Sequence, residues 1–316
     1  MSGATVAIID IGSNSIKTLI ATRGNQGEIL PLHTRTIDAR ISAGISRTSP
    51  RLSEEGMARG LEAVQSLLVD ADAYSASTVL LVATSAVRDA QNGTEFRRRV
   101  LDATGREIRI LTGDEEANLI GRGLTADPAL TGLQDFYVFD LGGGSLECLA
   151  FRDRRIEQAV SLQLGCVRLT ERFVADPTAP LDVATRQRVA AHTRAVLAES
   201  GFTFSLPPHA VAVGTGGTVT TARSIAATRR GKEFDTTDPV IAVSDLRGLL
   251  DELGAMPLPE RKQVPGLPPP RADVYPVALI TLITIAELGG FSAYHNSVYN
   301  LRYGLADQAL GAAIVR

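Results

Sequence analysis

The sequence has 316 residues, enough for two domains at ~150 residues each, and 44% of them are hydrophobic. This composition excludes a disordered or fibrous protein. The formal net charge of -3 argues against nucleic acid or an anionic membrane surface as a partner. The two cysteines, Cys148 and Cys166, are too few for a disulfide framework or a cysteine-based zinc site, so we expect both to be small core residues.

The amino-terminal segment MSGATVAIID has neither the basic region nor the cleavage site of a signal peptide. The longest apolar run, Val277–Leu288, is shorter than the ~20 residues that a membrane-spanning helix needs. Because this run is apolar on all sides, it predicts a buried helix. We therefore expect a cytoplasmic protein without a membrane partner.

The first part of the chain is predicted to alternate between strands and helices, which is typical of an α/β domain. The expected elements are strands at Thr5–Ile9, Ile16–Ala21, Thr78–Ala83 and Ile108–Leu111, a helix capped by Ser53 and a helix at Gly93–Thr104. A further helix is expected to be capped by Asp114, with Glu115 and Glu116 in its first turn.

The second part of the chain shows the same alternation. The expected elements are strands at Phe136–Phe139, Leu146–Phe151 and Ala210–Val213, and helices at Asp182–Glu199, from Val219, at Ser244–Leu253, at Val277–Leu288 and from near Tyr303. Asp182 and Ser244 are the predicted caps of their helices. Lys232–Thr237 is predicted as a loop and the proline-rich stretch Pro257–Pro270 as an ordered turn or linker.

Two segments of the chain resemble each other. VAIIDIGSNSIKTLIA aligns with FYVFDLGGGSLECLAF at a separation of 130 residues, which pairs Asp10 with Asp140 and Ser15 with Ser145. The repeat predicts two domains that share one hairpin design. The alternative is a chance similarity between two strand-turn-strand segments, because Asp, Gly and Ser are all common in turns.

Three Gly-rich turns each follow a predicted strand: Asp10–Ser15, Asp140–Ser145 and Gly214–Thr218. Glycine lets backbone amides converge on an anion, and an Asp at the end of a strand can hold a divalent cation. A steric role is the alternative for any single turn, but the three together predict phosphate binding. None is a Walker loop, because no Lys-Ser/Thr pair follows the glycines.

Charged residues near these turns are candidates for the chemistry. The acids at the start of the helix near Asp114 either stabilise the helix dipole or supply a carboxylate that orients and deprotonates a water. Glu147 lies on an otherwise apolar strand, so it is a plausible metal ligand. Candidate cations for a phosphate chain are Arg88, Lys17 and the cluster Arg229, Arg230 and Lys232, although the last three are equally consistent with solvated side chains.

Taken in order, these motifs make the chain similar to the exopolyphosphatase/guanosine pentaphosphate phosphohydrolase (Ppx/GppA) family of the actin–hexokinase–Hsp70 superfamily, over nearly its whole length. The resemblance is carried by DIGSNS at Asp10–Ser15, LSEEGMARGLEA at Leu52–Ala63, VATSAVRDA at Val82–Ala90, TGDEEANLI at Thr112–Ile120, DLGGGSLE at Asp140–Glu147, LGCVRLTE at Leu164–Glu171, GTGGT at Gly214–Thr218, RADVYPVALITL at Arg271–Leu282 and LRYGL at Leu301–Leu305.

The resemblance implies an α/β fold of two ribonuclease-H-like domains with an interdomain cleft. The expected domains are residues 1–130 plus 303–316, and residues 131–302, with the C-terminal helix returning to the first domain. It also implies a homodimer.

For the site, the resemblance implies that Glu116 is the catalytic general base and that Arg88 binds the transferring phosphoryl group. Together with the Gly-rich turns it gives a set of phosphate-binding candidates: Asn14, Ser15, Lys17, Gly143, Gly144, Ser145, Gly216, Gly217 and Thr218. The expected cofactor is Mg²⁺, with Asp140, Glu147 and Asp10 as candidate ligands.

The implied reaction is hydrolysis of a terminal phosphoanhydride of inorganic polyphosphate or guanosine pentaphosphate. Two positions depart from the family pattern: Leu146 stands where Thr is usual, and Gly217 breaks the usual Ser-Gly-Thr order. The C-terminal extension of longer members is not expected here, which favours short chains or nucleotides. The alternatives are an ATP-dependent kinase, since Gly214–Thr218 could lie under a nucleotide, and a non-catalytic alarmone-binding regulator, suggested by the two departures.

Overall fold

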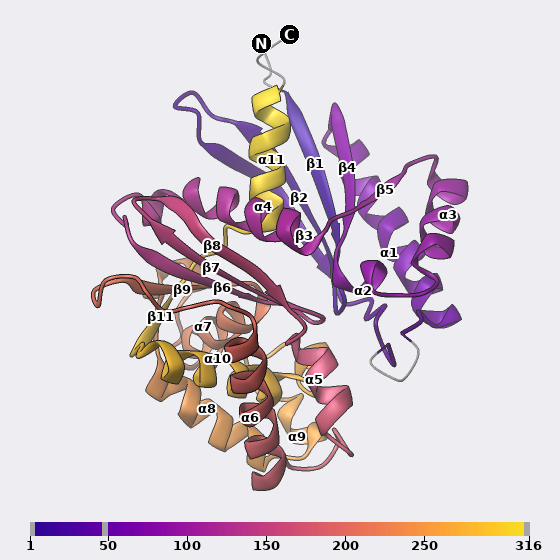
Figure 1. Cartoon of the computed structure of the whole chain (residues 1–316). Coiled ribbons are helices and arrows are strands. Elements are labelled where there is room, and N and C mark those ends of the chain that lie inside the picture. Colours follow the sequence, from indigo (N-terminus) through magenta and orange to yellow (C-terminus); the bar gives the residue numbers. More distant parts are fainter. Residues whose placement is uncertain (1–3, 46–49, 313–316) are drawn as a thin grey trace. The chain divides into compact units, whose positions relative to one another are not determined.

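The computed structural model describes residues 4–45 and 50–312. The chain forms two compact units, coloured along the sequence in Figure 1. Unit 1 comprises Met1–Gly132 and Tyr299–Arg316, and unit 2 comprises Leu133–Val298. Within the described ranges, every helix is too short or too polar to cross a bilayer.

Unit 1 is built on a five-stranded sheet with the strand order β3-β2-β1-β4-β5. Its strands are β1 (Thr5–Ile11), β2 (Ile16–Arg23), β3 (Ile29–Ile37), β4 (Thr78–Ala83) and β5 (Ile108–Ile110). The first three form an antiparallel meander, whereas β4 is parallel to β1 and β5 is parallel to β4. Its helices are α1 (Glu54–Ala73), α2 (Ser85–Arg88), α3 (Gly93–Thr104), α4 (Gly113–Thr125), α11 (Leu301–Ala312) and the short η1 (Pro128–Leu130).

The C-terminal helix α11 packs against α4 and against β1 and β2 (Figure 1). Glycines allow the close approach of α11 and α4: a Cβ on Gly304 would lie 1.9 Å from the carbonyl oxygen of Leu119. Asp307 of α11 also forms ion pairs with Arg23 of β2 and Arg122 of α4, at 2.7 and 2.6 Å. The last part of the chain is thereby fastened to unit 1.

Unit 2 is built on a six-stranded sheet with the order β10-β11-β9-β6-β7-β8. Its strands are β6 (Phe136–Leu141), β7 (Leu146–Arg152), β8 (Arg155–Leu162), β9 (Val211–Thr215), β10 (Val240–Ala242) and β11 (Ala293–Asn296). Its helices are α5 (Cys166–Phe173), α6 (Val183–Glu199), α7 (Gly217–Arg229), α8 (Val243–Ala255), α9 (Leu258–Arg261), α10 (Tyr275–Gly289) and the short η2 (Phe234–Thr236) and η3 (Pro269–Arg271).

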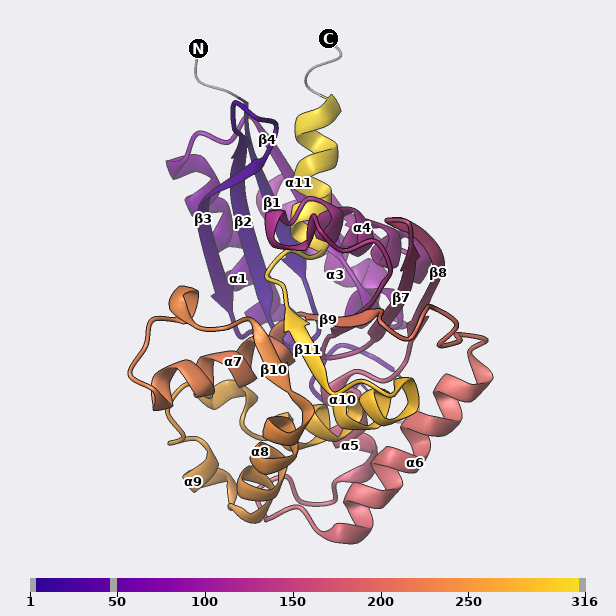
Figure 2. The ribbon, with the colours of Figure 1, turned by 90° about the vertical axis from the view of Figure 1, so that its left-hand side faces the viewer.

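Five strands of unit 2 repeat the topology of unit 1. The order β8-β7-β6-β9-β11 corresponds to β3-β2-β1-β4-β5, and β10 is added at the edge, antiparallel to β11 (Figure 2). A meander followed by parallel strands is the ribonuclease-H-like arrangement, so the predicted α/β fold class is confirmed. The two aligned hairpins, β1–β2 and β6–β7, occupy the same position in the two sheets.

The core of unit 2 lies on one face of this sheet. Tyr137 and Phe139 of β6 pack with Phe202, Phe204 and Phe291 in a cluster of mostly edge-to-face rings. Such pairs add to the stabilisation that buried area alone provides. Helix α10 is buried along most of its length, as its uniformly apolar sequence predicts. Both cysteines are buried, which confirms their expected role as core residues.

Two predicted helix caps are wrong. Helix α4 is capped by Thr112, not Asp114, because the Thr112 side chain and the side chain of Glu115 each accept a backbone N–H of the other residue. Helix α8 begins at Val243, so Ser244 lies inside its first turn. The proline-rich stretch contains α9, since Pro is tolerated in the first turn of a helix, and the predicted loop Lys232–Thr237 contains the short η2.

We expect Arg261→Met to lower the free energy of unfolding by about 3 kcal/mol or more. Arg261 is 2% exposed and donates hydrogen bonds to the carbonyl oxygens of Leu253, Ala272, Met256 and Ala179. Without the guanidinium these buried carbonyls lose their donor. Urea unfolding measures the change, and exposed Arg247→Met is the control, expected to stay within ~1 kcal/mol of the wild type. An equal loss in both variants would contradict this explanation.

Candidate phosphate-binding site

The β1–β2 turn of unit 1 is held by hydrogen bonds to its carbonyl groups and side chains. The Gly12 amide donates to the carbonyl of Ser15 at 3.2 Å, and a Cβ on Gly12 would lie 2.9 Å from that oxygen. Ser42 Oγ donates to the carbonyl of Ser13, and Arg40 Nε donates to Asn14 Oδ1 at 3.1 Å. Asn14 and Ser15, two of the predicted phosphate-binding residues, are thus fixed in a rigid, nearly buried turn.

Helix α2 connects this turn to the predicted catalytic residues. Its cap, Thr84, donates its amide to the carbonyl of Ile11, and Ser85 Oγ lies 3.1 Å from Ser13 Oγ. Arg88, the last residue of α2, donates from Nη1 to Glu116 Oε2 at 2.9 Å and to the carbonyl of Leu111. The structure therefore brings Arg88 and Glu116 into direct contact.

Glu116 occupies the first turn of α4 and is 6% exposed. Its neighbour Glu115 has a different role, because it completes the capping box with Thr112 and forms an ion pair with Arg109 at 2.7 Å. Of these two acids, only Glu115 therefore caps the helix. The buried carboxylate of Glu116 forms an ion pair with Arg88.

Asp10 and Lys17 face each other across the β1–β2 hairpin, where they form a cross-strand pair. Burial raises the pKa of Asp10 above its ordinary value of 3.8, and the charges of Lys17 and Arg302 offset part of this rise. The ionised form of Asp10 is therefore disfavoured in the folded chain.

We expect Asp10→Asn to stabilise the protein at neutral pH in metal-free buffer. With a raised pKa, folded Asp10 holds its proton to higher pH than the unfolded chain does, so stability falls as pH rises from 3.8 through the folded pKa. Asparagine removes this penalty. Unfolding free energies of the two proteins should converge in acid and diverge in favour of the variant towards pH 7. A variant that is less stable at pH 7, or equally so at all pH values, would refute the prediction.

In the β6–β7 turn of unit 2 the glycine carbonyls accept hydrogen bonds, whereas two of its amides have no acceptor among the described residues. The Gly143 carbonyl accepts from the amides of Val167 and Arg168 in α5, and Arg168 Nε donates to the carbonyl of Gly144 at 2.9 Å. The amides of Gly143 and Gly144 donate to no other residue within the described ranges. Free amides that follow one another in a turn form an anion-binding concavity. Ser145 closes the turn by accepting from the Gly142 amide at 3.0 Å.

Asp140 and Glu147 lie directly opposite each other on β6 and β7, so their side chains share one face of the sheet. Ser161 Oγ donates to Glu147 Oε1 at 2.8 Å. Two adjacent carboxylates repel each other unless a cation lies between them, and hard carboxylate oxygens are the ligands that Mg²⁺ prefers. The donor set thus fits a magnesium ion that takes its remaining ligands from water and phosphate.

No group of three or more His, Cys, Asp or Glu side chains that could hold a metal ion occurs in residues 4–45 and 50–312. Asp10 belongs to unit 1, whereas Asp140 and Glu147 belong to unit 2. The grouping of all three as ligands of one ion therefore stays a prediction.

The third Gly-rich turn leads from β9 into α7 and lies against Asp140. Gly216 has a φ of +78°, and a Cβ there would lie 2.2 Å from Asp140 Oδ1. A Cβ on Gly217 would lie 1.9 Å from Nη1 of Arg271. The departure at Gly217 therefore makes room for a guanidinium. Thr218 is buried in the first turn of α7, and its carbonyl accepts from the Tyr275 hydroxyl.

We expect Gly216→Ala to lower kcat/KM for the hydrolysis of a terminal phosphoanhydride, the reaction expected from the sequence, by ~10²-fold, because the new methyl group displaces the Asp140 carboxylate by about 1 Å. Gly201→Ala is a matched control, since Gly201 has a φ of +77° but nothing within 4 Å of its Cβ position. Both variants place a side chain at a positive φ, and Gly216, with a ψ of -171°, lies in a region that essentially only glycine adopts, so thermal unfolding of each variant measures its backbone strain separately from its activity. Equal activities of the two variants would show that the Asp140 contact does not matter.

The other departure, Leu146, lies outside the face that carries Asp140. Its side chain is fully buried in the hydrophobic core of unit 2, on the face of β7 opposite to Glu147. Leucine is therefore suited to this position by packing.

Two residues that contact the turns were not among the predicted site residues: Arg168, which holds the β6–β7 turn, and Arg271, which contacts Gly217. Both belong to motifs that carried the resemblance, LGCVRLTE and RADVYPVALITL. Arg271 lies at the end of η3, four residues before the first residue of the apolar helix α10, and an arginine this close to an apolar helix was the available signal.

A profile of the Ppx/GppA phosphatase family matches residues 19–312. The chain belongs to this family. It is 31% identical over 325 residues to exopolyphosphatase 2 of Mycobacterium tuberculosis, an alignment that covers 98% of this chain and 100% of that protein.

Solved structures of similar proteins agree with this membership of the Ppx/GppA family at the level of the fold. An exopolyphosphatase from Cytophaga hutchinsonii superimposes with a TM-score of 0.87 at 24% identity, covering 98% of each chain. The Ppx/GppA family member of Aquifex aeolicus gives a TM-score of 0.78 at 23% identity, again over 98% of each chain.

Proposed function

We propose that this Ppx/GppA protein hydrolyses terminal phosphoanhydride bonds of inorganic polyphosphate or guanosine pentaphosphate and releases orthophosphate. The observation that carries the proposal is the 2.9 Å contact between Arg88 and Glu116 in a member of a phosphatase family. A buried carboxylate beside an arginine can act on water while the guanidinium binds the phosphoryl group under attack.

In this mechanism, Glu116 orients a water in line with the terminal phosphorus and accepts its proton at Oε. Arg88 donates to the oxygens of the transferring phosphoryl group, where negative charge is held in the transition state. The free amides of Gly143 and Gly144 donate to further phosphate oxygens. The amides of Gly143 and Gly144 are held in position before substrate binds, since α5 and Arg168 already donate hydrogen bonds to the carbonyls of the same turn.

Asp140 and Glu147 are the residues that would hold Mg²⁺. When bound, the ion supplies positive charge that neutralises phosphate oxygens. Ser161 and Gly216 keep the two carboxylates in place, the first by a hydrogen bond to Glu147 and the second by leaving space for Asp140.

The test is phosphate release from short polyphosphate, long polyphosphate and guanosine pentaphosphate, side by side, with and without Mg²⁺. The reactions contain neither ATP nor an acceptor, so a kinase would release no phosphate. We expect Mg²⁺-dependent release from at least one of the three substrates. Binding of guanosine pentaphosphate without turnover of any substrate would overturn the proposal in favour of a non-catalytic regulator.

A further inference from the structure

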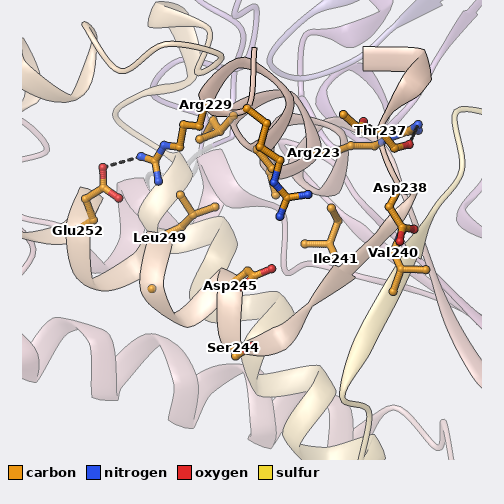
Figure 3. Close-up of a pocket in the computed structure, with 15 residues that line it drawn as sticks. Arg223, Arg229, Thr237, Asp238, Val240, Ile241, Ser244, Asp245, Leu249 and Glu252 are labelled. Carbon is orange, nitrogen blue, oxygen red and sulfur yellow. Dashed lines mark hydrogen bonds and ion pairs between the residues drawn. The ribbon is translucent and has the colours of Figure 1, made fainter. Parts of the chain in front are cut away.

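Unit 2 contains a cavity that none of the three Gly-rich turns lines. It has a volume of about 380 Å³ and lies between α7 and α8 (Figure 3). Arg229 and Glu252 form an ion pair at one end, at 2.6 Å, and Thr237 and Asp238 lie at the other end. A cavity of this size accommodates a small organic molecule.

Part of the cavity lining is apolar. Ile241, Ile225 and Leu249 are all buried and contribute hydrocarbon surface. Gly248 of α8 also lines the cavity, and a Cβ at this position would meet no atom within 4 Å. The lining can therefore cover an apolar stem or ring, and it leaves open space beside α8.

Arg223 brings a buried positive charge to the cavity. It is 9% exposed and donates to the Thr237 hydroxyl and to the carbonyls of Thr237 and Phe234, while its guanidinium lies over the Phe234 ring. These partners are all uncharged. Within the described ranges, Nη1 of Arg223 makes no hydrogen bond and no carboxylate forms an ion pair with it. A buried charge is stable only when it is well compensated, and here a ligand anion can provide that compensation.

The remaining charges of the cavity are of both signs. Arg230, also in the lining, forms no ion pair with any residue that the structure describes. On the opposite wall, Asp245 of α8 forms neither an ion pair nor a hydrogen bond within residues 4–45 and 50–312. Since Arg229 and Glu252 neutralise each other, the charges that remain are the guanidinium groups of Arg223 and Arg230 and two carboxylates. One carboxylate, Asp238, accepts the backbone amide of Val240, and the other, Asp245, is available on the wall formed by α8.

We propose that this cavity binds a small zwitterionic ligand, with its anionic group on Arg223 and Arg230, its ammonium group on Asp245 and its apolar stem on Leu249 and Ile241. Helix α7 connects this site to the third Gly-rich turn. Arg223 follows Gly217 by six residues, or ~9 Å along the helix axis. A ligand in the cavity would thus contact the same helix that begins at the third Gly-rich turn.

Three ring compounds of nearly equal size test the charge pattern: 4-(aminomethyl)benzoate, which is zwitterionic, 4-methylbenzoate, which is anionic, and 4-methylbenzylamine, which is cationic. Ligand-observed NMR titrations to ~10 mM measure binding, since millimolar affinity is expected for ligands of this size. We expect the zwitterion to bind about tenfold more tightly than either singly charged compound. Equal binding of all three, or no saturable binding of the zwitterion, would overturn the proposal.

Two variants locate the binding. Gly248→Phe fills the open space beside α8 and should abolish binding of the zwitterion, whereas Gly248→Ala, its control, should retain it. Asp245→Asn should reduce the affinity for the zwitterion to that for 4-methylbenzoate. Unchanged binding in Gly248→Phe would place the ligand elsewhere and refute the site. Because the readout is binding rather than phosphate release, this result is independent of the proposed hydrolysis.

Discussion

Glu116→Gln is expected to lower kcat by ~10²–10⁴-fold while substrate binding persists. Glutamine keeps the size of the side chain and can still accept a hydrogen bond from Arg88 through its amide oxygen, but it cannot take a proton from water. The loss should therefore appear in kcat rather than in KM. Steady-state phosphate release measures both constants, and equilibrium binding of the substrate to the variant measures affinity directly.

Glu115→Gln is the matched control. Glu115 neighbours Glu116 in the first turn of α4, is exposed, and caps the helix with Thr112. Glutamine also serves in a capping box, so the helix should remain intact. We expect near wild-type kcat for this variant. Full activity of Glu116→Gln, or an equal loss in both variants, would remove Glu116 from the mechanism.

Arg88→Met is the second large effect, with an expected loss of ~10³–10⁵-fold in kcat/KM. The substitution removes the positive charge that we assign to the transferring phosphoryl group and leaves the buried Glu116 carboxylate without its 2.9 Å partner. Arg88→Lys should recover only part of the activity, because an ammonium group lacks the forked donors of a guanidinium. Phosphate-release assays at several substrate concentrations provide the comparison.

Arg109→Met is the control for Arg88. Arg109 pairs with Glu115 as Arg88 pairs with Glu116, but at an exposed position. An exposed ion pair contributes little to stability, so this variant should keep both activity and stability.

The double variant with Glu116→Gln and Arg88→Met should lose less activity than the product of the two single losses, because residues in direct contact act together. Independent, multiplying losses would show that the two side chains work separately.

The candidate site residues differ in kind between the two units. Unit 1 contributes charged side chains, Arg88 and Glu116, which contact each other. The turns of unit 2 contribute backbone amides and the paired carboxylates of Asp140 and Glu147. The hairpin common to both units also carries different charges, since Asp10 lies opposite Lys17 in unit 1 and Asp140 lies opposite Glu147 at the corresponding position in unit 2.

Local sequence patterns predicted many of the elements, although not β3, β8, α5, β10 or β11, and they named most of the candidate residues. Apolar runs that stop at an Asp and a Gly turn predicted both hairpins, and Gly93–Thr104 matches α3 to the residue. These features depend on neighbours within a few positions, where steric and hydrogen-bonding preferences are strong. The prediction of Asp114 as the cap was wrong because Thr112 is also a good cap and its reciprocal hydrogen bonds with Glu115 favour it.

Contacts between distant segments could be found only in the folded chain. Arg88 and Glu116 were each identified from motifs, but their hydrogen bond depends on how α2 and α4 follow β4 and β5 in the sheet. Arg271 contacts Gly217, and Arg223 lies in a cavity where no carboxylate of the described residues pairs with it, because packing against the sheet determines the positions of the ends of long side chains. The sequence thus specifies which backbone turns form, since these are local. Tertiary packing determines which charged side chains contact each other. It brings together residues that are far apart along the chain, and no periodic pattern in the sequence predicts such contacts.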